Sequence, residues 1–374
     1  MTHYIWQRPE WTCFQWKNEN ILLALGECRL LQGKLLGRVA DLGLTFENHA
    51  QMEILAEETL KTAAIEGESL NEKAVRSSVA RKLGLPSAGL PVDRHVDGLV
   101  SVLLDATKNH DDYLTEKRLF GWHAALFPTG YSGMHKIIVG AWRGDKLMQV
   151  ISGRIGHETV HFEAPPSDSI PNEISRFLGW WKESRGNAEG LLRAAIAHFW
   201  FVTIHPFEDG NGRIARALTD MAVAQDDGQS IRYYSLSSQI MTEREAYYDV
   251  LERCQKGNGD ISEWLTWFLG CFCRAIKRSE TLLATVLDKA TFWKTHAQTS
   301  LSERQRKVIN RLLDAGRGGF EGGLTTRKYV SIAGVSRATA FREMDQLVKR
   351  GILKQNTGGG RSVSYDLNWA GKSD

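Results

Sequence analysis

A short polar loop between two strongly apolar helical segments constrains this chain more than any other feature of its sequence. The apolar pattern from Leu191 to Ile204 predicts one helix, which ends at Pro206 because proline lacks an amide hydrogen and clashes with the preceding turn. A second helical pattern begins near Arg213 and runs through Ala224. Two apolar helices must therefore meet at a polar elbow.

The remaining sequence is also predicted to be mainly helical. Helical spacing of apolar residues occurs in segments 47–70, 99–108, 116–126, 174–184, 190–204, 214–225, 243–255 and 261–277. Strand signals are sparse, and the clearest are in residues 148–163, which alternate and contain glycines. We expect a mainly α fold with one β-hairpin.

Composition narrows the class of protein. Of 374 residues, 42% are hydrophobic and 24% are charged, which excludes a disordered or collagen-like chain. No apolar run reaches the roughly 20 residues that span a bilayer, and residues 1–10 contain no signal-peptide core. The five cysteines form no Cys-x-x-Cys pair. We expect a cytoplasmic protein with no membrane partner and with reduced cysteines.

The elbow has the composition of a phosphate-binding turn. Glycine and asparagine tolerate left-handed backbone angles, so the N–H groups of Gly210, Asn211 and Gly212 can point into one concavity. That concavity opens at the N-terminus of the second helix, where the helix dipole favours anions. Arg213 and Arg216 add charge-assisted donors for phosphate oxygens.

Two more side chains of the elbow provide what group transfer needs. Asp209 offers a hard oxygen ligand suited to Mg²⁺ that is carried by phosphates. His205 offers an imidazole suited to accepting a proton near neutral pH. A plain helix junction with a capping Asn-Gly pair is the alternative, but it would not require all these groups within twelve residues. The segment therefore predicts a phosphotransfer site.

These twelve residues resemble the signature of Fic-domain proteins, His-Pro-Phe-x-(Asp/Glu)-Gly-Asn-Gly-Arg-x-x-Arg, at every defined position. The resemblance implies a helical core that transfers AMP from ATP to a Ser, Thr or Tyr hydroxyl of a protein, itself included. It implies that His205 is the general base and that Asp209 binds Mg²⁺. The residues implied to hold the ATP phosphates are Gly210, Asn211, Gly212, Arg213 and Arg216. The related Doc kinases have Lys in place of Gly210, which argues against simple phosphate transfer.

Residues 62–67, Thr-Ala-Ala-Ile-Glu-Gly, resemble the inhibitory motif of the same family, (Ser/Thr)-x-x-x-Glu-(Gly/Asn). The resemblance implies that Glu66 pairs with Arg216 and displaces the γ-phosphate of ATP into an unproductive position. The other interpretation is an ordinary helix end with Glu66 in solvent and Gly67 terminating the helix.

Residues 157–161, His-Glu-Thr-Val-His, fit a pattern of zinc proteases. That site needs both histidines on one helix face, whereas the surrounding glycines and prolines favour a strand, on which residues four apart lie about 13 Å from each other. Zinc proteolysis is therefore a remote alternative. In Fic domains a hairpin here forms the flap that docks the target by strand pairing, a role that the resemblance gives to His157, Glu158, Thr159, Val160, His161 and Phe162.

A further helix, which starts near Glu243, carries the adjacent tyrosines Tyr247 and Tyr248. This pair resembles the tyrosines that line the adenine pocket of Fic proteins. The other interpretation is that at least one of them belongs to the core.

The basic residues are concentrated at the C-terminal end. Residues 301–374 contain 14 Lys and Arg against 7 Asp and Glu, and the other 300 residues contain 33 against 37. Helices over 302–315, 325–333 and 336–350, followed by strands at 352–354 and 362–367, resemble a winged helix. DNA binding would use Arg337, Thr339, Arg342 and Arg361. Glu343 and Asp345 oppose groove entry, so a protein-interaction or dimerisation module of the same fold stays open.

We expect an N-terminal helical region over residues 1–112, a Fic catalytic domain over 113–295 and a winged helix over 296–374. The leading hypothesis is an autoinhibited protein adenylyltransferase that uses ATP and Mg²⁺. The alternatives are a Fic enzyme that removes AMP, with a glutamate positioning water, and a DNA-binding regulator whose Fic core senses nucleotide. A homodimer is compatible with each.

Overall fold

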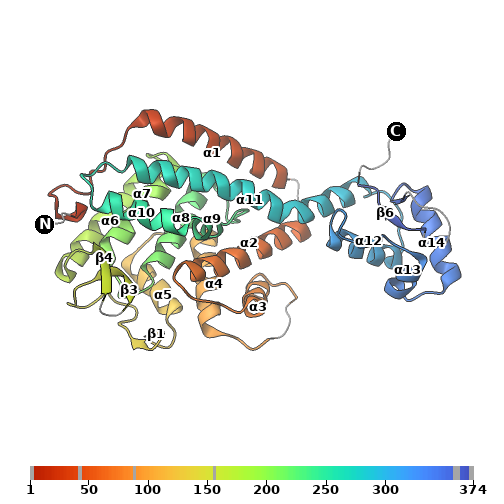
Figure 1. Ribbon diagram of the computed structural model, residues 1–374, viewed down its shortest axis with the longest axis horizontal. Helices are drawn as coiled ribbons and strands as arrows, with labels where there is room; N and C mark the ends of the chain where they lie inside the picture. The colour runs from red at the N-terminus through yellow and green to blue at the C-terminus, as the bar shows by residue number, and fades with distance from the viewer. Residues whose placement is uncertain (1–3, 41–43, 87–89, 155–156, 357–362, 370–374) are drawn as a thin grey trace. The chain divides into compact units, whose positions relative to one another are not determined.

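The computed structural model describes residues 4–40, 44–86, 90–154, 157–356 and 363–369 and shows a mainly α protein (Figure 1). The chain divides into two compact units. The larger unit contains residues 1–37 and 51–279, and the smaller one contains residues 38–50 and 280–374. The predicted domain boundaries after residues 112 and 295 remain predictions.

The helices and strands up to residue 163 lie in the following order. They are η1 (Ile5–Gln7), α1 (Asn18–Val39), α2 (Leu44–Ile65), α3 (Glu72–Lys82), α4 (Arg94–Lys108), α5 (Glu116–Leu126), β1 (Tyr131–Ser132), β2 (His135–Lys136), β3 (Gln149–Arg154) and β4 (His157–Glu163).

The remaining elements are almost all helical. They are η2 (Ser167–Ser169), α6 (Ile170–Ser184), α7 (Gly190–Ile204), α8 (Asn211–Asp227), α9 (Leu236–Thr242), α10 (Arg244–Gln255), α11 (Ser262–Thr295), α12 (Glu303–Ala315), α13 (Thr326–Ala333), α14 (Arg337–Lys349), β5 (Leu353–Gln355) and β6 (Tyr365–Leu367).

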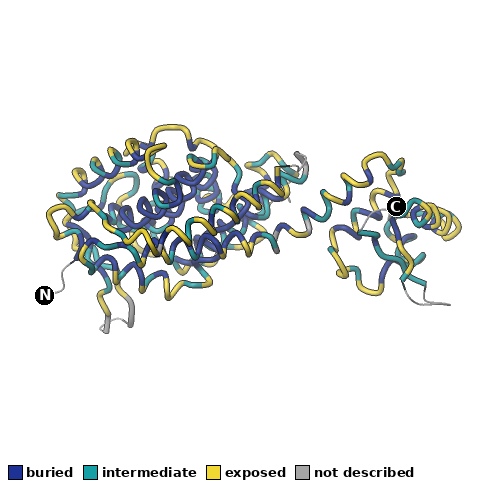
Figure 2. The backbone as a smooth tube through the Cα atoms, turned by 90° about the horizontal axis from the view of Figure 1, so that it is seen from above, coloured by how far each residue is buried: buried dark blue, intermediate teal, exposed yellow. Residues whose placement is uncertain are grey.

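Helices α7 and α8 form the centre of the larger unit, where Figure 2 shows the buried backbone in dark blue. Every residue of α7 except Leu192 is buried. Its few polar side chains find partners there, as when the Thr203 hydroxyl donates to the Phe199 carbonyl at 2.7 Å. Each buried Leu, Ile or Phe contributes roughly 1.5–3 kcal/mol, so this pair of helices holds the elbow between them on a rigid support.

Helix α2 ends earlier than the apolar pattern predicts. The pattern runs to residue 70, but the helix stops at Ile65, and Gly67 has φ +83°. The Glu68 N–H donates to the Ala63 carbonyl and the Gly67 N–H to the Ala64 carbonyl, both at 3.0 Å. This is a Schellman cap, which uses the left-handed freedom of glycine to satisfy the last carbonyls. The cap sets the direction of the residues that follow Ile65.

Helices α1 and α3 were not predicted, and α11 extends 18 residues beyond the predicted end at 277. Helix α1 packs along α11, and the buried Cys28 thiol donates to the Leu269 carbonyl at 3.1 Å. No helix among the described residues combines the length and the apolar character that crossing a bilayer requires.

The predicted hairpin is present as the antiparallel pair β3 and β4. The register shifts between Val150 and Ile151, and His161 is the extra residue of β4 at this position. Such a bulge bends a hairpin and increases its twist. At its base Phe162 is buried against Tyr4, whose ring meets it edge-on at 5.3 Å. The N-terminal segment therefore covers one side of the hairpin base.

In the smaller unit the predicted helices agree with α12, α13 and α14 to within one residue at each end. The Ser336 hydroxyl accepts from the Thr339 N–H at 3.2 Å and caps α14, as expected of serine at this position. Strands β5 and β6 pair antiparallel, and Leu324 forms a bridge with Tyr365. A core that includes Val308, Ile309, Leu312, Tyr329 and Leu347 holds the unit together. Assignment to the winged-helix class remains a proposal.

Candidate active site

The elbow between α7 and α8 has two residues in left-handed conformation. His205, with φ +52°, caps the C-terminus of α7, and it is the one non-glycine residue with positive φ in the described part of the chain. Gly210, with φ +83°, is the N-cap of α8. Asn211 closes the loop between them, because its amide accepts from the Phe207 N–H at 3.0 Å and donates to the Phe207 carbonyl at 2.8 Å. The Asn211 side chain is therefore structural, and its backbone N–H is the group left to face a ligand.

The imidazole of His205 is oriented from one side. Its Nδ1 lies 3.2 Å from the Val202 carbonyl oxygen. A carbonyl only accepts, so Nδ1 carries the proton and Nε2 has its lone pair available. Burial lowers the pKa of His205, and the positive charge of Arg143 lowers it further against the raising effects of Glu66 and Asp209. The ring is thus neutral near pH 7 and can accept a proton at Nε2.

The N-terminus of α8 is already in contact with a carboxylate. A Cβ placed on Gly212 would lie 2.2 Å from Glu66 Oε1, so only glycine lets that side chain approach so closely. Glu66 Oε1 accepts from Arg216 Nη2 at 2.8 Å. Arg216 also donates to the hydroxyl of Thr62 at 2.6 Å and to its carbonyl at 2.9 Å. The sequence-predicted pair of Glu66 and Arg216 is therefore brought together, with Thr62 as a third member.

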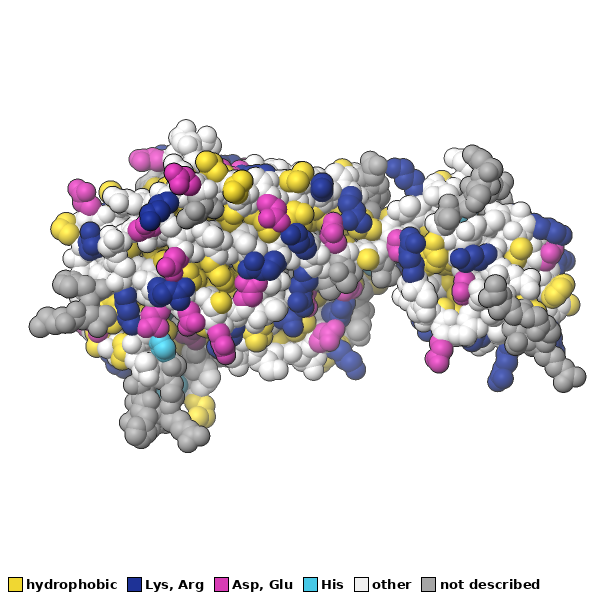
Figure 3. All heavy atoms as spheres, turned by 45° about the horizontal axis from the view of Figure 1, so that its top comes forward, with side chains coloured by type: hydrophobic (Ala, Val, Ile, Leu, Met, Phe, Trp, Pro, Cys, Tyr) yellow, Lys and Arg dark blue, Asp and Glu magenta, His cyan; other side chains and the backbone are white. Residues whose placement is uncertain are grey.

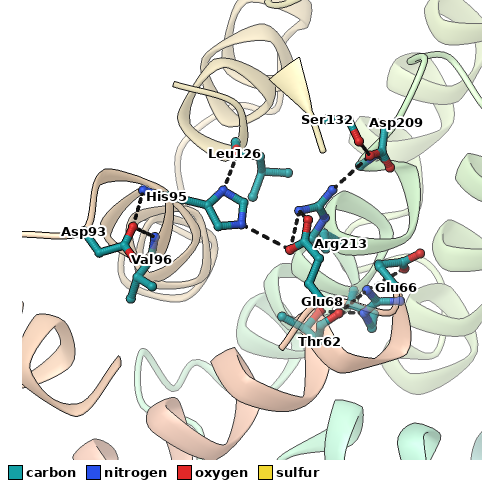
Figure 4. Close-up of polar contacts among 12 residues, drawn as sticks. Thr62, Glu66, Glu68, Asp93, His95, Val96, Leu126, Ser132, Asp209 and Arg213 are labelled. Carbon is teal, nitrogen blue, oxygen red and sulfur yellow. Dashed lines mark hydrogen bonds and ion pairs between the residues drawn. The ribbon is translucent and has the colours of Figure 1, made fainter. Parts of the chain in front are cut away.

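A second carboxylate engages the other arginine (Figure 4). Arg213 Nη1 donates to both oxygens of Glu68 at 3.1 Å, and the guanidinium lies over the Phe127 ring at 4.8 Å. Glu68 Oε2 is 3.1 Å from His95 Nε2, and His95 Nδ1 is 3.0 Å from the Leu126 carbonyl. Both partners of the His95 ring are acceptors, so the arrangement is satisfied by the imidazolium. Its hydrogen bond to Glu68, opposed by burial, raises the pKa of His95.

Asp209 is the candidate metal ligand. Its Oδ2 accepts from the Ser132 hydroxyl and lies 3.5 Å from Arg213 Nη2, and its Oδ1 accepts from the Gly210 N–H. No group of three or more His, Cys, Asp or Glu residues that could hold a metal occurs among the described residues. One carboxylate oxygen is nevertheless the donor set that Mg²⁺ uses when nucleotide phosphates supply further ligands. Asp209 therefore fits a metal that arrives with a nucleotide.

The two tyrosines of α10 lie in different surroundings. Tyr247 is 2% exposed, and its hydroxyl is 2.9 Å from Nε2 of the buried His198. Tyr248 is half-buried, and its hydroxyl lies 3.4 Å from the Ile65 carbonyl at the end of α2. Burial lowers the pKa of His198 to about 3, so its neutral ring anchors Tyr247. Tyr247 thus belongs to the buried core, as the other interpretation of the tyrosine pair holds, while Tyr248 borders the end of α2.

The residues predicted for the flap all lie on β4. The side chains of His157 and Glu158 lie outside the described part of the structure. Thr159 and Val160 are exposed, His161 pairs with Glu252 of α10 at 2.6 Å, and Phe162 is buried. The strand conformation confirms the expectation that the two histidines of this segment share no helix face.

Four residues of the site were not among those predicted from the sequence, namely Glu68, His95, His123 and Arg143. His123 stacks on Phe207 at 4.1 Å, and its Nε2 is 3.2 Å from the Asp209 carbonyl. Burial lowers the pKa of His123 to about 4, so its ring is neutral where it packs against the elbow. Of these, Glu68 has a weak sequence signal, as a second acidic residue directly after residues 62–67, which resemble the inhibitory motif.

Comparison with known proteins agrees with the geometry of this elbow. Residues 113–223, which include it, match the Fic/DOC family. The chain contains a Fic domain. The segment ahead of the Fic domain, residues 4–85, matches a domain of unknown function, DUF4172.

The Fic domain has relatives at modest identity. The chain is 26% identical over 240 residues to the protein adenylyltransferase Fic of Culex quinquefasciatus, which is 63% of this chain and 43% of that protein. Over 119 residues it is 29% identical to the uridine 5′-monophosphate transferase of Xanthomonas campestris pv. campestris (strain 8004), which is 29% of this chain and 21% of that protein. The chain thus spans less than half the length of these curated relatives.

The fold is similar to that of a Fic family protein from Desulfovibrio desulfuricans G20, whose crystal structure superposes with a TM-score of 0.58 at 19% identity. The similarity covers 93% of this chain and 95% of that one.

Proposed function

We propose that this Fic-domain protein is a nucleotidyltransferase that moves AMP from ATP to a Ser, Thr or Tyr hydroxyl of a protein. The observation that carries the proposal is a neutral imidazole, with Nε2 available, at the end of α7, next to a helix N-terminus flanked by two buried arginines. Relatives named protein adenylyltransferase support AMP as the transferred group.

The chemistry is a single displacement at the α-phosphorus. His205 Nε2 accepts the proton as the target hydroxyl oxygen forms its bond to that phosphorus, and the bond to the β-phosphate oxygen breaks, releasing pyrophosphate. The N–H groups at the start of α8, together with Arg213 and Arg216, stabilise the charge that moves onto the phosphate oxygens. A positioned general base accounts for about 10²–10⁴ of the rate.

Asp209 would hold Mg²⁺ together with the phosphates, and the metal would neutralise charge on the leaving pyrophosphate. The hydrogen bonds from Ser132 and Gly210 keep the Asp209 carboxylate oriented toward the elbow. Tyr247 and Tyr248 would line the adenine side, with Tyr247 held in place by His198.

We further propose that Glu66 inhibits this reaction. Its carboxylate occupies Arg216 and lies against Gly212, so a triphosphate that reaches Arg216 must displace it. The Arg216 side chain is 1% exposed and that of Glu66 24%, so solvent screens this ion pair only in part.

The decisive experiment is mass spectrometry of Glu66→Gly protein after incubation with Mg²⁺ and ATP. We expect the mass of one AMP on a hydroxyl, strongly increased over the wild-type chain. The matched control is Glu66→Gly with His205→Ala, which should bind ATP and transfer nothing. A parallel incubation with UTP is needed because one relative is a uridine 5′-monophosphate transferase. An unmodified Glu66→Gly protein in all nucleotides, with folding intact, would overturn the proposal.

The same geometry supports a second candidate, the removal of AMP from a modified protein. The Glu66 carboxylate beside Gly212 could orient a water molecule toward the α-phosphorus. Incubating an AMP-modified protein with the wild-type chain and with Glu66→Gln distinguishes the two activities. Release of AMP by the wild-type chain alone would favour removal.

We also propose DNA as a partner of the smaller unit. Glu343, expected to oppose groove entry, is instead buried, where it accepts from the Tyr329 hydroxyl at 2.7 Å and pairs with Arg304. Of the residues predicted to contact DNA, Arg337 and Arg342 are exposed on α14, Thr339 is half-buried, and Arg361 lies outside the described residues. Figure 3 shows Lys and Arg side chains over this unit. A duplex-binding assay tests this, since binding must weaken steeply with salt. Salt-independent binding or none would favour a protein or dimer contact.

A further inference from the structure

Arg143 lies in the loop before β3 and is 5% exposed, yet no sequence pattern marks it. Its Nε donates to the His205 carbonyl at 2.8 Å, and its backbone N–H donates to the Pro206 carbonyl at 2.9 Å. A terminal nitrogen donates to the Pro165 carbonyl. Arg143 thus contacts the carbonyls of His205 and Pro206 at the start of the elbow. It also contacts the carbonyl of Pro165, which follows the predicted flap strand.

The guanidinium of Arg143 makes no ion pair with any residue that the structure describes. Its charge is held by the carbonyl oxygens of His205 and Pro165 alone, and the first of these lies at the C-terminal end of α7. The negative end of a helix dipole stabilises a cation placed there. Burial of a charge without a counter-ion is costly and lowers the pKa of Arg143. We therefore expect the buried Arg143 charge to have a function that offsets this free-energy cost.

The hydrogen bonds of Arg143 support the unusual backbone conformation of His205. A non-glycine residue with φ +52° is strained by roughly 1–3 kcal/mol and persists only when its surroundings over-determine it. The hydrogen bonds of Arg143 to His205 and Pro206 are such surroundings. Glu66 and Asp209 are the charged groups that oppose the effect of Arg143 on the imidazole.

Arg143 also connects His205 to the flap. Pro165 follows β4 directly after Ala164, whose N–H donates to the Met148 carbonyl at 2.9 Å. The Trp6 indole donates to the Glu163 carbonyl at 2.7 Å and anchors the same segment. The Arg143 side chain therefore contacts both His205, the proposed base, and the segment that follows β4, the strand proposed to dock the target.

We propose that Arg143 is a positioning residue for nucleotidyl transfer, which holds His205 in its left-handed conformation and in register with the flap. The inference rests on the proposed function but concerns orientation of the base, so two kinds of measurement test it.

The first measurement is the rate of transfer in the Glu66→Gly background, with Arg143→Met and Arg143→Lys. We expect kcat to fall roughly 10²-fold for Met, because a misplacement of about 1 Å costs that much, while KM for ATP stays within about twofold. Arg143→Lys keeps the charge but cannot make both side-chain bonds, so it should recover only part of kcat. Equal kcat in all three proteins would overturn the inference.

The second measurement does not depend on transfer. The titration of the His205 ring is followed by NMR, with His205→Ala assigning its signal. Removing the positive charge in Arg143→Met must move the titration to higher pH, and Arg143→Lys must leave it nearly unchanged. An unchanged titration in Arg143→Met would overturn the inference, even if the proposed transfer itself failed.

The matched control is Arg193→Met. Arg193 is a buried arginine on α7 that donates to Ser184 Oγ at 2.9 Å and to the Trp181 carbonyl at 2.8 Å, without contacting the elbow. It should lose folding stability like any buried arginine but keep the His205 titration and KM. Thermal unfolding of each variant separates loss of fold from loss of position.

Discussion

Arg213 and Arg216 lie one turn apart on α8 and are equally buried, yet they are held differently. Arg216 donates three hydrogen bonds of 2.6 to 2.9 Å at the end of α2, two to Thr62 and one to Glu66. Arg213 shares one nitrogen between the two oxygens of Glu68 at 3.1 Å, and its Nε forms no hydrogen bond with a residue that the structure describes.

Both carboxylates come from a single Schellman cap, since Glu66 and Glu68 flank Gly67. One turn of backbone therefore presents one carboxylate to each arginine. The Glu68 side chain is 31% exposed and is shared with His95, whereas the Glu66 side chain is 24% exposed and lies against Gly212 at the N-terminus of α8. These contacts hold Arg213 more weakly than Arg216, so under the proposed function we expect the Arg216 contact to contribute most of the inhibition.

The largest effect should come from removing each arginine in the Glu66→Gly background. Arg213→Ala and Arg216→Ala should each lower kcat/KM by roughly 10²-fold or more, because a charge pair with phosphate is worth about 2–5 kcal/mol. The readout is AMP incorporation against ATP concentration. If one variant kept full activity, the two arginines would not share the phosphate-binding role.

The next effect concerns Thr62. Thr62→Val removes the hydroxyl that accepts from Arg216, and a hydrogen bond to a charged group contributes about 1.5–3 kcal/mol. We expect self-modification of the otherwise intact chain to rise about tenfold. The matched control is Thr59→Val, one turn earlier on α2, whose hydroxyl donates to the Leu55 carbonyl. A similar rise in both variants would point to general loosening of α2.

A smaller gain should follow Glu68→Gln. The neutral amide would release Arg213 in part, and we expect a few-fold rise in nucleotide affinity, measured by calorimetry, since partly exposed ion pairs contribute less than about 1 kcal/mol. Glu72→Gln, whose partner Arg76 is exposed, provides the control. A fall in affinity would mean that Glu68 orients Arg213 for phosphate.

The smallest effect is a pH dependence of stability through His95. Because the hydrogen bond to Glu68 raises the pKa of His95, its contribution is fully present below the ordinary histidine pKa and is lost as pH rises through the raised value. Although burial opposes it, His95 and Arg213 lower the pKa of Glu68, so the pair also weakens in strong acid. We expect His95→Gln to cost less than about 1 kcal/mol at pH 6 and nothing at pH 9, by thermal unfolding. An equal cost at both values would contradict the assignment.

Local patterns predicted the parts of the site that lie within one stretch of chain. The elbow from His205 to Arg216, its flanking helices and the hairpin follow from apolar spacing, proline and glycine, whose effects reach only a few residues. The Glu66 contact was anticipated from a resemblance, and the structure places its carboxylate 2.8 Å from Arg216.

Contacts between distant segments could not be predicted in this way. Arg143 and Glu68 are ordinary surface residue types in the sequence, and their roles depend on which backbone carbonyl or guanidinium packing brings within 3.1 Å. Helices α1 and α3 were also missed, because tertiary packing against α11 and α4 outweighs their weak local signals. Residue type and spacing specify which groups are available, but burial and long-range packing select which of them meet, because the free energy of a polar contact depends on the partners and the solvent that the fold leaves around it.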